Sequence, residues 1–241
     1  MGADQNINWR HAAASALDWW HEAGVDTLVD DAPRAWLREP RAAEARPADQ
    51  IAAPAPAQPA ALPDTIDAFE TWRIGPGAPE AGWPGAPIAA RGNPAADLAI
   101  VVDMPERDDG DTLLSGAAGI LFDRMLAAIG RDRSSVYLAP LCAIRPMSGQ
   151  IPADLGPPLA EIALHRLALC RPRRLLLMGN AASRALLGVN AAAGRGCLHV
   201  LNHAGGQAET VASFPPRFLL EQPTRKAEAW KDLQLVAGGL A

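Results

Sequence analysis

The sequence is poor in cysteine, lysine and long apolar runs, and each scarcity excludes a class of protein. Its three cysteines, at positions 142, 170 and 197, are too widely spaced for a disulfide framework or a zinc ribbon. Only Lys226 and Lys231 among the 22 basic residues are lysines, and the net charge is -5. This charge excludes a strongly basic nucleic-acid-binding protein, although a local basic patch remains compatible with it. The apolar runs at 98–102 and 175–178 are far shorter than the roughly 20 residues of a membrane helix.

The beginning of the sequence shows no basic segment followed by an apolar one, so we expect no signal peptide. A chain of 241 residues with 49% hydrophobic residues can bury a sizeable core without cross-links. No internal repeat is visible. We therefore expect a cytoplasmic, monomeric protein that does not bind membranes.

Composition divides the chain into three regions. Residues 1–37 carry a helical pattern in which Trp9, Trp19 and Trp20 recur among alanines, and Gly24 is typical of a helix end. Residues 38–64 are rich in proline and alanine and have almost no large apolar side chains, which predicts a flexible linker. Residues 65–241 are expected to form the folded domain. The tryptophans of the 9–24 helix either pack onto that domain or bind a protein partner.

Predicted strands and helices alternate along the folded domain. Strands are expected at 98–102, 135–141 and 174–178, a hairpin at 197–201 and 208–214 around Gly205-Gly206, and helices at 117–129, 157–170, 181–187 and 223–236. This alternation favours a mostly parallel sheet with helices on both faces. In such folds the ligand lies at the carboxyl ends of the strands, here just after Val102, Leu138, Met178 and Ser213.

Several stretches carry a family resemblance. They read VDMPE at 102–106, SGAAGILFDRMLAAIG at 115–130, IRPMSGQIP at 144–152 and PPRFLLEQPTRKAEAWKDL at 215–233. In the order and sequence of these motifs, residues 97–236 resemble the uracil-DNA glycosylase superfamily, specifically its bacterial iron–sulfur branch, family 4. The resemblance implies an α/β fold: a three-layer αβα sandwich around a central, mostly parallel, four-stranded sheet. It also implies base excision from DNA as the ancestral activity.

The positions that carry chemistry in the family are occupied differently here. By this resemblance, Asp103 stands for the glutamate near the scissile bond, and Pro105 and Leu114 lie at the base pocket, where the family has an aromatic residue that stacks on uracil. Pro140 replaces the asparagine that reads the uracil edge, and Pro215 replaces the histidine that stabilises developing charge. Proline offers no side-chain donor or acceptor. Losing such a stabilising donor alone typically costs about 100- to 1,000-fold in rate.

The resemblance also bears on DNA contacts. Glu106 stands where the family keeps a glycine near the DNA, and its negative charge opposes a phosphate. Weak DNA binding is still expected through seven residues that match the family's backbone contacts, namely Ser115, Gly116, Asn180, Pro216, Arg217, Arg225 and Lys226.

A [4Fe–4S] cluster, which the family branch holds, requires four thiolates. The sequence has three cysteines, and the positions of the third and fourth ligands fall at Ile144 and near Leu159. We therefore expect no cofactor and no metal, and we interpret Cys142 and Cys170 as small buried hydrophobic residues.

Two functional hypotheses follow. In the first, the chain is a glycosylase-fold protein without excision activity, which acts as a binding or scaffold module in DNA repair. In the second, it is an active glycosylase with a rebuilt site around Asp103. His199 and His203 are either surface residues of the hairpin or substitutes for the missing histidine.

Overall fold

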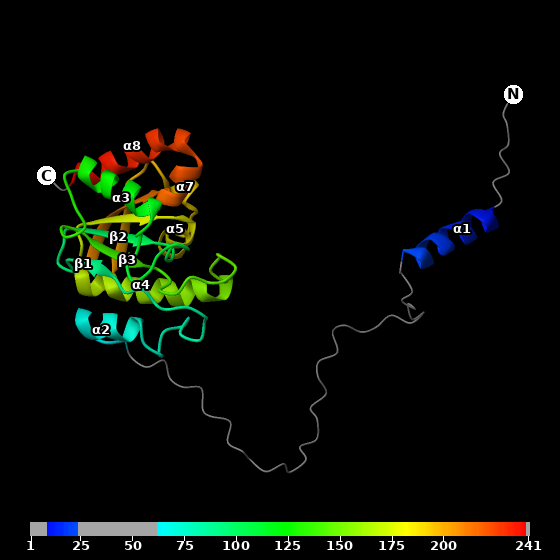
Figure 1. Ribbon diagram of the computed structural model, residues 1–241, viewed down its shortest axis with the longest axis horizontal. Helices are drawn as coiled ribbons and strands as arrows, with labels where there is room; N and C mark the ends of the chain where they lie inside the picture. The colour runs from blue at the N-terminus through cyan, green and yellow to red at the C-terminus, as the bar shows by residue number, and fades with distance from the viewer. Residues whose placement is uncertain (1–8, 24–61, 240–241) are drawn as a thin grey trace, which may run out of the picture. The chain divides into compact units, whose positions relative to one another are not determined.

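The computed structural model describes residues 9–23 and 62–239 (Figure 1). The chain separates into two units, Met1–Ala57 and Gln58–Ala241. In the first unit, the predicted helix is present as α1 (Trp9–Glu22), and it exposes Leu17, Trp19 and Trp20. The predicted linker at 38–64 falls almost entirely outside the described residues.

The second unit is built on a mixed sheet with strand order β1-β3-β2-β4-β6-β5. Its strands are β1 (Arg91–Gly92), β2 (Leu98–Val102), β3 (Tyr137–Pro140), β4 (Arg174–Met178), β5 (His199–His203) and β6 (Gly206–Ser213). The four central strands are parallel, as predicted, and antiparallel β1 and β5 at the two edges bring the total to six. The predicted hairpin is β5–β6, with His203 paired to Gly206, so its turn lies one residue earlier than expected.

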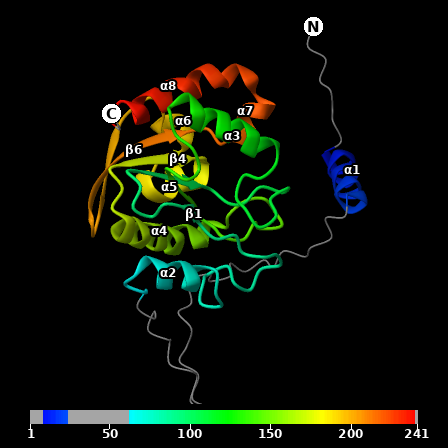
Figure 2. The same ribbon diagram turned by 60° about the vertical axis from the view of Figure 1, so that its left-hand side comes forward.

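Helices cover both faces of this sheet, which confirms the α/β sandwich (Figures 1 and 2). They are α2 (Ile66–Arg73), α3 (Ala117–Ala128), α4 (Gly156–Cys170), α5 (Asn180–Leu187), α6 (Ala191–Gly194), α7 (Pro216–Glu221) and α8 (Lys226–Ala237). Because strand side chains alternate between faces, Leu98, Ile100 and Val102 pack with α3 and α8, whereas Ala99 and Val101 pack with α4 and α5. None of the helices in the described ranges is long and apolar enough to cross a membrane.

Helix α2 packs on the side of α4 that faces away from the sheet. A fully buried ion pair, Arg73–Glu80, connects the end of α2 and the segment that follows it to the loop after β3. Glu80 Oε1 accepts hydrogen bonds from Arg73 Nη2 at 2.6 Å and from the Ala143 amide at 2.7 Å. Arg73 Nη2 also donates to the Leu141 carbonyl at 2.8 Å. The two side chains are 1% and 0% exposed. The pair therefore holds two segments together that are more than sixty residues apart in sequence.

Candidate functional site

A pocket of about 640 Å³ opens at the carboxyl ends of the parallel strands, where the fold rule predicts a ligand site. We call it the strand-end pocket. Its wall combines arginines, carboxylates and phenylalanines, among them Arg107, Arg145, Arg217, Asp103, Glu106, Asp108, Glu221, Phe214 and Phe218. Loops after β2, β3 and β6 supply most of these side chains. Segments distant in sequence thus build one polar site with aromatic surface.

Asp103, the first residue after β2, is held by the beginning of α5. Its Oδ1 accepts a hydrogen bond from the Ala182 amide at 2.8 Å. Gly179 leaves the space for this approach, because a Cβ at that position would collide with the Asp103 carboxyl group. Burial raises the pKa of Asp103, opposed by the amides of α5 and by the charge of Arg217. The carboxyl group therefore serves first as a cap for a helix N-terminus.

The residues that match the family's uracil-reading positions belong to the core. Leu114 is 2% exposed and packs in the cluster with Val102 and Met178, with a backbone φ of 53° in the left-handed region. Pro140 is buried in β3, and its carbonyl accepts a hydrogen bond from Arg166 at 2.8 Å. Neither side chain lines the strand-end pocket.

A second cavity lies beside the strand-end pocket, and it is nearly filled. Asp103, Leu114 and Pro215 all border it, together with Met178 and Pro216, and its volume is about 10 Å³. That is space for at most about one water molecule. We call it the closed cavity. Pro105 borders neither space, and its carbonyl accepts a hydrogen bond from Arg145 Nη1 at 2.9 Å.

Glu106 faces two arginines rather than open solvent. One oxygen of its carboxylate lies 3.8 Å from Arg145 Nη1 and 3.7 Å from Arg217 Nη1. Burial raises the pKa of Glu106, while Arg217 and Arg145 lower it and the charges of Asp109 and Asp103 raise it further. We expected the negative charge of Glu106 to repel a phosphate. The structure adds that the same carboxylate forms ion pairs with two cationic side chains, Arg145 and Arg217.

The strand-end pocket also contains an aromatic pair that was not predicted from the sequence. The rings of Phe214 and Phe218 lie 4.8 Å apart between centroids. The guanidinium group of Arg195 lies 4.0 Å from the centroid of the Phe214 ring. The phenylalanines flank the Pro215 motif as SFPPRF, so this spacing was the available signal.

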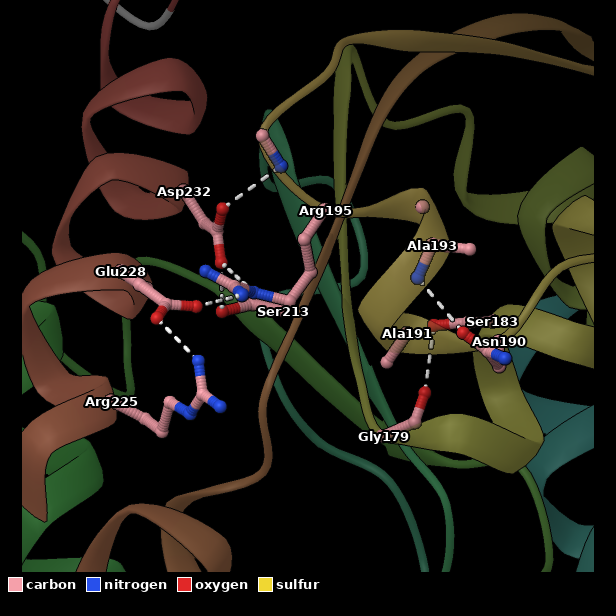
Figure 3. A network of polar contacts seen from close by, with 12 residues as sticks. Gly179, Ser183, Asn190, Ala191, Ala193, Arg195, Ser213, Arg225, Glu228 and Asp232 are labelled. Atoms are coloured by element: carbon pink, nitrogen blue, oxygen red, sulfur yellow. Dashed lines mark hydrogen bonds and ion pairs between the residues drawn. The ribbon is translucent and has the colours of Figure 1, made fainter. Parts of the chain in front are cut away.

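Arg195 is itself fixed from α8 (Figure 3). Its Nε donates to Asp232 at 2.8 Å and its Nη1 to Glu228 at 2.6 Å. Asp232, which is 0% exposed, also accepts hydrogen bonds from the Ser213 hydroxyl and the Gly196 amide. This network fixes the end of β6, and with it the start of the aromatic pair.

The expected DNA-contact residues divide into groups. Gly116, Asn180 and Arg217 line the strand-end pocket, and Pro216 borders the closed cavity. Ser115 is exposed, and its amide donates to Asp109 at 2.8 Å. The remaining two point elsewhere: Arg225 pairs with Glu228 at 2.6 Å, and Lys226 lines a separate groove between α3 and α8.

Neither histidine of the hairpin lines the strand-end pocket or the closed cavity. His199 Nε2 lies 2.8 Å from the Gly194 carbonyl on the outer edge of the sheet. His203, at the hairpin turn, has a pKa lowered chiefly by burial and also by Arg171. The structure therefore does not bring either ring to the position of the missing histidine.

The residues present do not fit an iron–sulfur cluster. Over 9–23 and 62–239, no three histidine, cysteine or acidic side chains gather as metal ligands. Cys142 is buried and its thiol donates to the Ile144 carbonyl, with burial raising its pKa to about 12. Cys170 ends α4 and Cys197 is exposed, and both Ile144 and Leu159 are buried apolar residues.

Comparisons with known proteins agree with this architecture. The family described as the uracil DNA glycosylase superfamily matches residues 89–234. A type-4 uracil-DNA glycosylase of Pyrobaculum aerophilum is 23% identical over 161 residues, which cover 63% of this chain and 82% of the relative. A type-4 uracil-DNA glycosylase of Archaeoglobus fulgidus is 24% identical over 155 residues, which cover 60% and 77%.

Proposed function

Because the chain belongs to the uracil-DNA glycosylase superfamily, we propose that it binds DNA with this fold but does not excise uracil. In this proposal it acts as a binding or scaffold module in DNA repair. The observation that carries it is the closed cavity of about 10 Å³, bordered by Asp103, Leu114 and Pro215. The relatives' activity supports the choice of DNA as the ligand.

Excision places demands on the site that these side chains do not meet. A glycosylase flips the base out of the stack, stacks it on an aromatic ring and hydrogen-bonds its edge. Leu114 offers only apolar contact, and Pro215 and Pro140 offer no side-chain hydrogen bond. The Asp103 carboxyl group already accepts the Ala182 amide. At the positions that the family uses, this chain therefore has no side chain that can stack on the base or hydrogen-bond its edge.

An alternative is an active glycosylase with a rebuilt site around Asp103. The observation that favours it is the place of Asp103, which borders the strand-end pocket and has a pKa raised by burial. Perturbed carboxyl groups in clefts are frequent in active sites. In this alternative the Asp103 carboxylate stabilises an oxocarbenium-like sugar while the anionic base leaves.

A uracil-release assay separates the two functions. We expect no uracil from single-stranded or double-stranded DNA, under conditions in which a type-4 uracil-DNA glycosylase releases it completely. The reason is the missing base pocket and charge stabiliser. Turnover that the Asp103→Ala variant abolishes would overturn the proposal and support the rebuilt site.

DNA binding is expected to depend on Arg217, which lines the strand-end pocket. Arg217→Gln should weaken binding of a labelled oligonucleotide about fivefold at low salt. It should also reduce the magnitude of the slope of log K against log salt by about one. Fluorescence anisotropy over a salt series measures both quantities. Arg124→Gln is the matched control, since Arg124 lines the α3–α8 groove instead. An equal loss in both variants would point to overall charge rather than to this pocket.

Helix α1 supports a second binding role. Its Leu17, Trp19 and Trp20 side chains are 66%, 65% and 55% exposed, and large exposed aromatic residues are enriched where proteins bind one another. In our proposal the chain is a monomer that presents this helix to a protein partner, while the second unit engages DNA.

A further inference from the structure

Two loops and helix α7 bring one carboxylate close to two guanidinium groups in the strand-end pocket. Glu106 follows β2, Arg145 follows β3 and Arg217 lies in α7 after β6. The same oxygen, Glu106 Oε2, lies 3.8 Å from Arg145 Nη1 and 3.7 Å from Arg217 Nη1. These distances exceed hydrogen-bond length, so the contacts are electrostatic and loose.

Hydrogen bonds fix the backbone of Glu106 but do not hold its carboxylate. The Glu106 amide donates to Asp109 Oδ2 at 2.8 Å, and Asp109 also accepts the Leu114 and Ser115 amides. Arg145 Nη1 is anchored on the Pro105 carbonyl at 2.9 Å. No hydrogen bond joins the Glu106 carboxylate to another described residue. Arg145 is therefore held independently of the carboxylate, by the Pro105 carbonyl.

The arginines and the aromatic pair together match the chemistry of a nucleotide in a single strand. Guanidinium groups bind phosphate oxygens in a planar fork, and a backbone phosphate carries the same single charge as the Glu106 carboxylate. Phe214 and Phe218 in the same pocket offer the aromatic surface on which unpaired bases stack. A duplex keeps its bases stacked internally, so the pocket suits a single strand better.

We propose that the Glu106 carboxylate competes internally with a backbone phosphate of single-stranded DNA for Arg145 and Arg217. The bound strand displaces the carboxylate, which turns away from the arginines. This inference rests on the proposed function, because it assumes that DNA is the ligand. In this inference Glu106 lowers the affinity for single-stranded DNA, whereas Arg145 and Arg217 raise it. Asp103 does not share that role, since its carboxyl group is held by the Ala182 amide.

The test is a gain of binding in the full-length chain. The probe is a fluorescent oligothymidylate of about 16 nucleotides, the upper range of site sizes for single-strand-binding folds. Glu106→Gln should bind it about tenfold more tightly at low salt, because like charge opposite a phosphate is removed and both arginines are released. The plot of log K against log salt should steepen by about 0.7 for each additional phosphate that the released arginines neutralise.

Asp111→Asn is the matched control. Asp111 lies in the same loop and its substitution changes the net charge equally, yet it does not line the pocket. We expect less than about a twofold change in its affinity. Adding Arg145→Gln to Glu106→Gln should cancel most of the gain. Thermal unfolding of each variant confirms that the fold is retained.

The outcomes separate this inference from the proposed function. An unchanged affinity in Glu106→Gln, with measurable binding by the unsubstituted chain, overturns the competition alone. An equal gain in Asp111→Asn also overturns it, because a general charge effect then explains the result. If neither the unsubstituted chain nor Glu106→Gln binds the oligonucleotide at low salt, the proposed function and the inference fail together.

Discussion

Replacing Glu80 by leucine is expected to lower the free energy of unfolding by about 3–5 kcal/mol, the usual effect of breaking a buried ion pair. The substitution leaves the Arg73 guanidinium buried without its counter-charge and the Ala143 amide without its acceptor. Arg73 Nη2 retains only the Leu141 carbonyl. Urea denaturation, followed by circular dichroism, measures the difference.

A double variant tests whether the cost comes from the unpaired charge. Arg73→Met combined with Glu80→Leu replaces both partners by apolar side chains of similar length. Such replacements are frequently neutral or stabilising, so the double variant should recover most of the loss. If it is less stable than Glu80→Leu alone, hydrogen bonding to Leu141 and Ala143 matters more than the charge pair, and our explanation is wrong.

Asp232→Ala should be similarly destabilising, by about 3–5 kcal/mol, and should also weaken DNA binding. Its carboxylate accepts hydrogen bonds from Arg195, the Ser213 hydroxyl and the Gly196 amide, and alanine supplies none of them (Figure 3). Arg195 then loses its place over Phe214, the ring that we expect a base to stack on. Denaturation and oligonucleotide anisotropy measure the two effects on the same preparation.

Glu228→Gln provides the comparison for this network. Glu228 pairs with a second nitrogen of Arg195, Nη1, at 2.6 Å, but its side chain is 39% exposed. Exposed ion pairs contribute little to stability, because water and salt screen them. We therefore expect a small loss of stability and nearly unchanged DNA binding. A loss as large as that of Asp232→Ala would mean that Glu228, rather than the buried Asp232, positions Arg195.

Strands with a strong apolar pattern could be predicted from the sequence, and weakly patterned elements could not. The runs at 98–102 and 174–178 coincide with β2 and β4, because strands buried on both faces require continuous apolar residues. Strand β1 has two exposed residues, Arg91 and Gly92, so only its pairing with β3 defines it. Helix α2 has eight residues, of which Phe69 and Arg73 are buried, too few for a helical pattern.

The sequence indicated where to expect a pocket but not which side chains meet in it. The strand–helix alternation placed a candidate site at the strand ends, and Asp103 and Arg217 line the pocket found there. The sequence could not indicate that Arg145 and Arg217 converge on Glu106, because the three residues come from two loops and helix α7, whose approach depends on the whole sheet. Phe214 and Phe218 were missed for a related reason: their ring contact depends on how α7 begins after β6.

The buried Arg73–Glu80 pair has a consequence for how the protein is made. The segment after α2 and the loop after β3 are joined by side-chain and backbone groups of the chain itself. These contacts form as the chain folds, so the chain should regain its fold after dilution from denaturant in a buffer containing an iron chelator.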